Sequence, residues 1–403
     1  MTFIVSHPTG NTFVKALIEE LYQNELLEYF STTIGFGENC GEIFSILKKR
    51  RFYNIPDAKI ERFWYPELLR LLQRGAQEKK RRLVDQTYAK LDLKTSKEIE
   101  IKSGKVIHAY EDGAYQTFTR AKELGIQCSY ELPIAHWATG RRLLLEEAER
   151  YPEWEPTLES SRETEDKLFR KEEELWLADR ITCPSKFVLN SIPTEVRNHI
   201  PCQVAPFGSP VPAHNVSPKK QRNNEPFKIL FVGSMSQRKG LADLFEAMKL
   251  LKKEPVKLSI LGQQSMPMDF YRKQFSEFDY YPPCSNSKVH KIMQQHDALV
   301  LPSIVEGRAL VQQEALACGL PIIITPNTGG EDLVEKGTTG YLVPIQSPEN
   351  IAEAIRAIIE NRNHKDEIGK LCQKKAIQYT WANYAQNIID FNLSNHVQKL
   401  EIA

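Results

Sequence analysis

Short, mainly apolar runs alternate with amphipathic helical patterns along the second half of the chain. Runs of this kind predict buried strands at 228–233, 257–262, 298–302, 321–325 and 340–343. Apolar residues at helical spacing predict helices at 241–251, 289–295 and 309–318. The last of these helices is followed by Gly319 and Pro321, which are typical of a helix end. Strands that alternate with helices predict a parallel sheet with right-handed crossovers.

The first half shows the same alternation less clearly. Strands are predicted at 3–5, 106–109, 127–132, 181–185 and 203–206, with an amphipathic helix at 12–22. Prolines occupy five positions between 206 and 226, and proline resists both helix and sheet, so this segment is predicted to be a linker. We therefore expect an α/β protein with two domains and a cleft between them. The predicted domains are 1–205 and 227–375, joined by linker 206–226.

Composition narrows the class of protein. Of the 403 residues, 41% are hydrophobic and 26% are charged, which argues against a disordered chain and against a membrane-embedded one. The first residues lack the basic and apolar regions of a secretory signal. The seven cysteines are scattered without a Cys-x-x-Cys pair, which favours reduced thiols in a cytoplasmic protein. A net charge of +1 gives no indication of nucleic-acid binding.

One segment departs from this charge balance. Residues 46–82 hold twelve Lys or Arg against four Asp or Glu, with Phe63, Trp64 and Tyr65 beside them. One interpretation is a set of solvated helix faces. The other is a surface for anionic lipid or for a lipid-phosphate acceptor, which predicts a cytoplasmic protein in peripheral contact with the inner face of a membrane.

Candidate chemistry lies after the predicted strands, where parallel sheets bind ligands. Glu306 follows one strand, and the next helix begins near Ala309 with free backbone N–H groups that suit a phosphate. Glu314 lies within that helix, where its carboxylate could accept hydrogen bonds from a vicinal diol such as a ribose. The alternative is that Glu306 caps the helix and Glu314 is solvated.

A second candidate loop carries two adjacent cations. Arg238 and Lys239 lie between a strand and a helix on the expected ligand side of the sheet, and both side chains are natural partners of a diphosphate. The alternative is a solvated basic loop. Gly329 and Gly330 permit a close backbone approach to a ligand.

Together these segments resemble a known family. Gly-Ser-x-x-x-Arg-Lys-Gly at 233–240, Pro-Ser-x-x-Glu-Gly at 302–307, Ala-Cys-Gly-x-Pro at 317–321 and Thr-Gly-Gly at 328–330 are similar to motifs of the GT-B-fold retaining glycosyltransferases of family 4, the glycosyl transferases group 1. The resemblance implies two Rossmann-like domains. It also implies that the terminal segment 376–403, with Trp381, forms a helix that crosses back to the first domain.

The resemblance also assigns roles to the residues that match its motifs. Lys239 is implied to hold the diphosphate of the donor, Glu306 to lie near the transferred sugar and Glu314 to bind the ribose. The backbone of the donor segment is implied to meet sugar and phosphate, at Gly307, Arg308, Ala309, Leu310 and Val311.

Two positions depart from the family pattern. Arg308-Ala309 stands where the family usually has Phe-Gly. Ser234 replaces a usual arginine, so Arg238 becomes the candidate for the missing charge.

The first half offers acceptor-side candidates by the same resemblance. Gly10 and Asn11 lie in a strand-to-helix turn, and Glu111 ends the segment 108–111. His136 follows another predicted strand and is the third candidate catalytic residue, beside Glu306 and Lys239. Glu131 is an equally good match to the family position, and the alternative for His136 is a structural role beside Trp137.

The reaction implied is transfer of a hexosyl unit from a nucleotide diphosphate sugar to a hydroxyl of a glycan, a glycolipid or a small molecule. The chain contains no Asp-x-Asp pair, so transfer without a metal or any other cofactor is expected. An epimerase or a phosphorylase of similar shape is the enzymatic alternative. The non-enzymatic alternative is a catalytically weak sugar-nucleotide-binding partner of a related enzyme.

Overall fold

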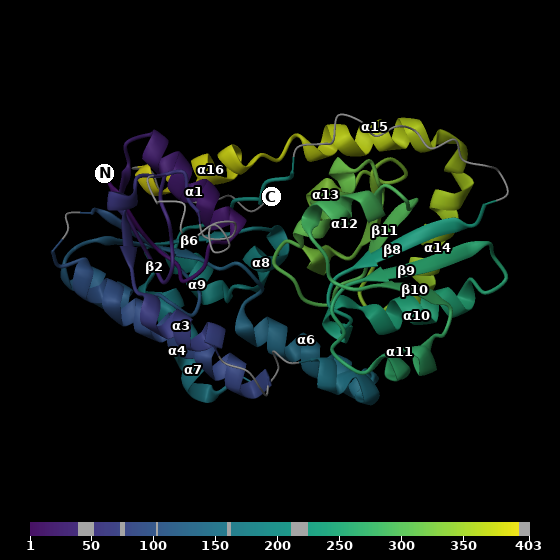
Figure 1. Ribbon diagram of the computed structural model, residues 1–403, viewed down its shortest axis with the longest axis horizontal. Helices are drawn as coiled ribbons and strands as arrows, with labels where there is room; N and C mark the ends of the chain where they lie inside the picture. The colour runs from purple at the N-terminus through teal and green to yellow at the C-terminus, as the bar shows by residue number, and fades with distance from the viewer. Residues whose placement is uncertain (39–51, 73–76, 102–103, 159–162, 211–224, 395–403) are drawn as a thin grey trace.

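A computed structural model describes residues 1–38, 52–72, 77–101, 104–158, 163–210 and 225–394. Two parallel sheets form two domains, which lie side by side in Figure 1. The α/β class and the two-domain architecture predicted from the sequence are confirmed. The basic residues 48–51 of the predicted lipid surface lie outside the described residues, as do residues 211–224 of the predicted linker.

The first sheet has seven strands in the order β3-β2-β1-β4-β5-β6-β7. Their bounds are β1 Phe3–Ser6, β2 Leu27–Thr32, β3 Ile60–Arg62, β4 Val106–Tyr110, β5 Gln127–Glu131, β6 Arg180–Cys183 and β7 Cys202–Val204. The helices of this half are α1 Thr12–Gln23, α3 Trp64–Leu72, α4 Gln77–Glu98, α5 Tyr115–Glu123, α6 Trp137–Arg150, α7 Glu165–Leu177, α8 Lys186–Ser191 and α9 Thr194–His199. Strands β2 and β3 were not predicted from the sequence.

The second sheet has six strands in the order β10-β9-β8-β11-β12-β13. Their bounds are β8 Phe227–Val232, β9 Val256–Leu261, β10 Phe278–Tyr281, β11 Ala298–Leu301, β12 Ile322–Ile324 and β13 Gly340–Leu342. The helices are α10 Leu241–Leu250, α11 Met268–Gln274, α12 Asn286–Met293, α13 Leu310–Ala317, α14 Pro348–Glu360, α15 Lys365–Ala376 and α16 Trp381–Leu393. All five predicted strands of this half are present, because buried parallel strands are nearly continuous apolar runs.

The last helix completes the core of the first domain. Buried residues of α16, among them Ala385 and Ile388, pack in one cluster with Val14 and Leu17 of α1. Figure 1 shows α16, in yellow, beside α1 although the two lie at opposite ends of the chain. The predicted return of the terminal helix to the first domain is confirmed.

Helix α6 and the 3-10 turn Pro152–Thr157 join the two domains. Trp154 is only 1% exposed and packs against Phe245 and Tyr271, within the core of the second domain. On α6 itself, Leu143 and Leu144 pack against Ile304 and Val305 of the second domain. The first half of the chain therefore supplies part of the second domain's core.

Candidate active site

The site lies where the second sheet reverses its strand order. Strands β8 and β11 are neighbours in space, while the chain between them runs outward through β9 and β10. Loops that leave the carboxyl ends of two such strands diverge and form a crevice for ligands. Arg238 and Lys239 follow β8 in the 3-10 turn Gln237–Lys239, and Glu306 follows β11.

These three side chains meet. One carboxylate oxygen of Glu306 lies 2.7 Å from Nη1 of Arg238 and 2.5 Å from Nζ of Lys239. Burial lowers the pKa of Lys239, and the nearby carboxylate of Glu306 opposes this shift. The cluster holds two cations and one anion, so it carries an excess positive charge that a bound anion would neutralise.

Backbone contacts fix the two loops against each other. The carbonyl of Arg238 accepts a hydrogen bond from the amide of Ile304 at 2.9 Å, and its Nη1 donates to the carbonyl of Val305 at 3.0 Å. Gly240 ends the turn with φ 72°, and a Cβ there would lie 2.0 Å from the carbonyl oxygen of Pro302. Only glycine fits this position, so the approach of the two loops depends on it.

The N-terminus of α13 faces the same junction. Ala309 precedes the helix and gives it no side-chain cap. Among the described residues, no acceptor is bound to the amides of Leu310 and Val311, as is usual in a first helical turn without a cap. Two free N–H groups and the positive end of the helix dipole suit a phosphate oxygen.

Glu314 lies one turn further along α13 and is half-buried. Within the described part of the chain, its carboxylate makes no hydrogen bond or ion pair. Burial raises the pKa of Glu314, while His290 on α12 opposes the shift. The carboxylate predicted to bind a diol is therefore available for a ligand.

Arg308 does not lie beside the other two cations. Its guanidinium donates to Asp332 at 2.8 and 3.1 Å and to the carbonyl of Gly329 at 2.9 Å, and it lies 4.9 Å from the ring centroid of Tyr379. Burial acts to raise the pKa of Asp332, but the charge of Arg308 and the hydrogen bonds from Arg308 and Tyr379 together lower it. The departure at Arg308 thus has a structural role in holding the Gly-Gly turn.

Loops of the first domain reach the site at Gly307. The hydroxyl of Ser185 donates to the carbonyl of Gly307 at 2.7 Å. A Cβ on Gly307 would lie 1.7 Å from the carbonyl oxygen of Pro133, so the glycine permits direct contact between the domains. Ser185 ends a predicted strand, but it was not predicted to be a site residue. Its position at the carboxyl end of a parallel strand, where such sheets bind ligands, is the signal that could have found it.

His136 is not brought together with Glu306 or Lys239 by any contact among the described residues. It begins α6, and its Nε2 lies 3.1 Å from a carboxylate oxygen of Glu172, which also accepts from Nε1 of Trp137 at 3.0 Å. Glu131, the alternative match, is buried and accepts from the hydroxyl of Tyr384 at 2.7 and 2.8 Å.

The acceptor-side candidates lie at the corresponding reversal of the first sheet, between β1 and β4. Gly10 and Asn11 follow β1, and Glu111 follows β4. Nζ of Lys171 lies 3.4 Å from the Glu111 carboxylate. Burial raises the pKa of Glu111 to about 7; Lys171 opposes the shift and the neighbouring acid Asp112 adds to it.

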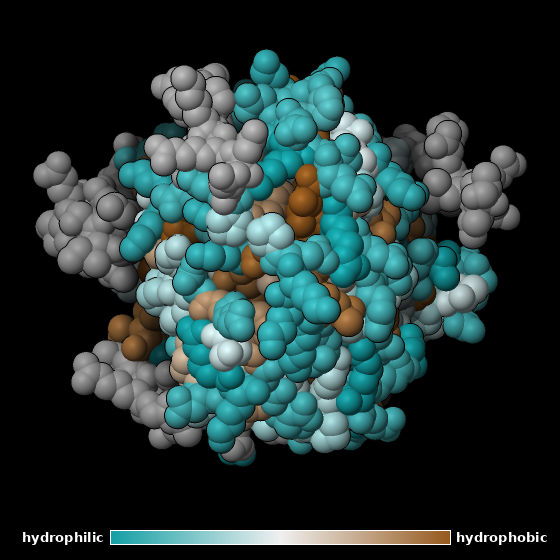
Figure 2. All heavy atoms as spheres, turned by 90° about the vertical axis from the view of Figure 1, so that its right-hand side faces the viewer, coloured by the Kyte–Doolittle hydropathy of each residue, from teal (hydrophilic) through white to brown (hydrophobic). Residues whose placement is uncertain are grey.

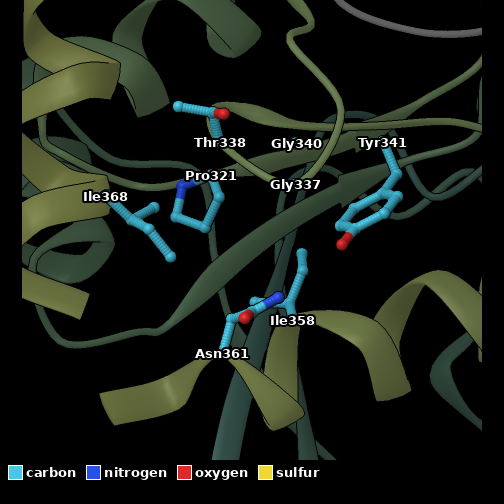
Figure 3. A pocket seen from close by; sticks show the side chains of 8 residues that line it. All are labelled: Pro321, Gly337, Thr338, Gly340, Tyr341, Ile358, Asn361 and Ile368. Atoms are coloured by element: carbon cyan, nitrogen blue, oxygen red, sulfur yellow. The ribbon is translucent and has the colours of Figure 1, made fainter. Parts of the chain in front are cut away.

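Two hollows lie away from this cluster. The cavity in Figure 3, between β13 and helices α14 and α15, has a volume of about 10 Å³, enough for about one water molecule. An open groove of about 350 Å³ runs along α6 beside Trp137 and Arg142. Neither contains the cations described above, so the site is defined by its charged loops.

Comparison with known proteins agrees with this geometry. Residues 214–375 match the model of the family described as glycosyl transferases group 1. A D-inositol 3-phosphate glycosyltransferase of Paenarthrobacter aurescens is 28% identical over 170 residues, which are 40% of this chain and 42% of the relative. A putative colanic acid biosynthesis glycosyltransferase of Escherichia coli is 25% identical over 190 residues, 43% of this chain and 46% of the relative. The matches thus span less than half of these relatives.

Solved structures extend the likeness of the fold to the whole chain. Sucrose-phosphate synthase from Thermosynechococcus elongatus has a TM-score of 0.67 at 18% identity, covering 97% of this chain and 98% of that one. HepE of Anabaena, solved with UDP-glucose, has a TM-score of 0.59 at 14% identity, covering 97% and 99%. The second domain therefore matches the glycosyl transferases group 1 over residues 214–375, and the chain as a whole has the GT-B fold.

Proposed function

We propose that this protein transfers a hexosyl unit from a nucleoside diphosphate sugar to a hydroxyl acceptor, with retention of the anomeric configuration and without a metal. The observation that carries the proposal is the cluster of Arg238, Lys239 and Glu306 at the strand reversal, in front of the uncapped N-terminus of α13. A diphosphate would neutralise the excess positive charge of this cluster, and its oxygen atoms would accept hydrogen bonds from the free N–H groups of the helix.

The difficult step is departure of an anionic diphosphate from a carbon that gains positive charge. Lys239 and Arg238 would turn from Glu306 to the phosphate oxygens, and the amides of Leu310 and Val311 would bind them from the other side. The carboxylate of Glu306, released from its two cations, would then lie beside the sugar and stabilise its positive charge. Because the cations replace a metal in this scheme, transfer is expected to persist with a chelator present.

Nucleotide binding tests the donor site directly. Thermal unfolding of the native protein is to be measured with UDP, GDP and ADP and with their sugars, because a ligand of the native state raises the melting temperature. We expect one nucleotide to raise it, and the rise to be lost in Lys239→Ala and Glu314→Ala. Lys249→Ala, on the exposed face of α10, is the matched control and keeps the rise. A native protein that none of these ligands stabilises contradicts the proposal.

Turnover separates an enzyme from a weak sugar-nucleotide-binding partner. With the nucleotide identified, release of free nucleotide from its sugar conjugates is measured with and without EDTA, and the anomer of the product is assigned by NMR. Tight binding without release, under every acceptor offered, favours the partner. Product of inverted configuration overturns the retaining mechanism, and loss of turnover with EDTA overturns metal independence.

The acceptor is proposed to be a glycan or a lipid-linked molecule held by the first domain, near an anionic membrane. Helix α3 supports this: Trp64, Tyr65, Leu68, Leu69 and Leu71 are 46%, 61%, 52%, 40% and 50% exposed on nine residues. By contrast, Figure 2 shows mainly hydrophilic side chains on the outer end of the second domain, with small separate hydrophobic areas. Exposed apolar clusters mark interaction surfaces, and the basic sequence beside α3 suits an anionic one. Among the described residues, no helix has the length and hydrophobicity needed to span a bilayer.

Vesicle binding tests this contact. We expect the protein to sediment with vesicles that contain phosphatidylglycerol and not with phosphatidylcholine alone, and Leu68→Ser with Leu69→Ser to reduce the bound fraction severalfold. Leu250→Ser changes an equally exposed leucine, 51% exposed, on α10 of the other domain and should leave binding unchanged. Equal binding by both variants contradicts the assignment to α3.

A further inference from the structure

Two polar side chains on neighbouring helices, beside the proposed donor site, lack hydrogen-bond partners among the described residues. Nε2 of His290, on α12, is buried and has no hydrogen-bond partner in the part of the chain that the structure describes. Glu314, on α13, has no hydrogen bond or ion pair within the described residues. Both helices begin at the carboxyl edge of the second sheet, because α12 follows β10 and α13 follows β11.

His290 acts electrostatically on the carboxyl group of Glu314 without touching it. His290 is the charge partner that acts on the carboxylate of Glu314, yet no hydrogen bond or ion pair joins them. Buried polar atoms without partners are rare, because each forfeits a hydrogen bond that it would make in water. Only Nε2 of His290 is a buried atom of this kind, and the half-buried carboxylate of Glu314 on the neighbouring helix also lacks a partner among the described residues. A polar group that binds to both side chains would explain the pair.

We propose that Nε2 of His290 binds a hydroxyl of the donor's ribose, together with the carboxylate of Glu314. The inference rests on the proposed function and deepens it, since it makes the site selective for ribonucleotides. A ribose offers two adjacent hydroxyls, and each hydroxyl both donates and accepts. The carboxylate of Glu314 only accepts, so the oxygen of the hydroxyl it binds stays available for an N–H of His290. A deoxyribose removes one of these hydroxyls and leaves a buried group unpaired.

The experiment compares ribonucleotides with their deoxy analogues. Dissociation constants of UDP, GDP and ADP, and of the 2′-deoxy and 3′-deoxy forms of whichever binds, are measured by calorimetry for the native protein and for His290→Ala. We expect the native protein to bind one deoxy form about five- to tenfold more weakly, and His290→Ala to bind the parent nucleotide more weakly by a similar factor. The two losses should not add, because both remove the same hydrogen bond.

Two further variants keep the test decisive. His290→Gln can place an amide N–H near the position of Nε2 and should recover part of the affinity. If His290→Ala weakened binding only by disturbing the fold, the amide would not restore the affinity. Lys288→Ala changes an exposed residue of the same helix and serves as the control. A His290→Ala protein with native affinity, or one whose losses add fully to those of both deoxy analogues, overturns the inference and leaves the proposed function intact. A native protein that binds no nucleotide removes the proposed function, and the inference with it.

Discussion

At the scale of single residues, the site separates charges that act on a ligand from charges that hold the fold. Arg238 and Lys239 share one carboxylate oxygen and carry an excess positive charge. Arg308, only two residues from Glu306, instead places its guanidinium, 4% exposed as a residue, between Asp332 and Tyr379. Glu306 therefore contacts the two cations of the site, whereas Arg308, two residues later, stabilises the fold.

The structural role of Arg308 predicts a loss of stability on truncation. Arg308→Ala leaves Asp332, Gln313 and the carbonyl of Gly329 without their donor. Arg308 is buried but Asp332 is exposed, so we expect the free energy of unfolding, measured by urea denaturation, to fall by about 1–3 kcal/mol. Arg308→Lys keeps the charge but not the bidentate hydrogen bonds, so its free energy of unfolding should fall by less. Two variants that unfold at the native midpoint would contradict this assignment.

Glu111 predicts a dependence of stability on pH. Its pKa in the folded protein is raised from an ordinary value of 4.5 to about 7, first by burial. A carboxyl group with a raised pKa favours the folded state most at low pH, and this contribution is lost as the pH rises from about 4.5 through about 7. Between pH 5 and pH 8, the free energy of unfolding of the native protein should therefore fall by about 1–3 kcal/mol more than that of Glu111→Gln.

Urea midpoints of both proteins at the two pH values measure this difference. Glu149→Gln, an exposed glutamate on α6, is the control and should follow the native protein at both pH values. A Glu111→Gln variant whose stability changes with pH as the native protein does would show that Glu111 is not responsible.

At the scale of elements, α16 is attached to the first sheet by polar as well as apolar contacts. The hydroxyl of Tyr384 donates to both carboxylate oxygens of Glu131, and Tyr384 is only 1% exposed. On the same helix, Ile388 and Ile389 are part of the first domain's core. The terminal helix is therefore part of that domain in its packing, although it follows the second domain in sequence.

Tyr384→Phe isolates the polar contact. The ring stays in place, while the buried carboxylate of Glu131 loses the tyrosine hydroxyl as a donor and keeps His108, whose Nε2 lies 3.2 Å from it. We therefore expect the free energy of unfolding to fall by about 1–3 kcal/mol. Chemical denaturation followed by circular dichroism measures the change. Gln386→Ala, on the exposed side of α16, should be neutral. A neutral Tyr384→Phe would mean that packing alone attaches the helix.

At the scale of the whole molecule, α6 and the turn after it connect the domains. Glu147 of α6 accepts a hydrogen bond from Gln237 at 2.5 Å, and Nη2 of Arg150 lies 2.6 Å from Asp243. Gln237 directly precedes the two cations of the site. The position of the proposed donor loop therefore depends on a helix from the first half of the chain.

Trp154→Ala tests this connection. Truncating a fully buried tryptophan leaves a cavity in the second domain, and we expect the free energy of unfolding to fall by about 3–5 kcal/mol. Differential scanning calorimetry should show an earlier unfolding transition and weaker stabilisation by the nucleotide that binds. Trp176→Ala removes a tryptophan that is 45% exposed and should leave both nearly unchanged. Equal effects of the two substitutions would contradict a role of Trp154 in the second core.

Strands β8, β9, β11, β12 and β13 and helices α10, α12 and α13 of the second half could be predicted because their signals are local, whereas β10 was missed. Runs such as 228–233 must be apolar on both faces to lie inside a parallel sheet, and the matching strand β8 occupies Phe227–Val232. In the first half, β2 and β3 were missed. Strand β3 is only three residues long, and sheet pairing with β2 decides its structure.

The sequence by itself determined which residues of the proposed donor site are neighbours along the chain: Arg238 beside Lys239, and Glu306 in the loop that leads into the helix of Glu314. Only the tertiary structure decided that Glu306 pairs with both cations, that Arg308 turns to Asp332, and that Ser185 of the first domain binds Gly307. The physical reason is range. Spacing along a strand or helix follows from backbone geometry, whereas partners that are 68 or 122 residues apart meet only after two sheets and a connecting helix have packed.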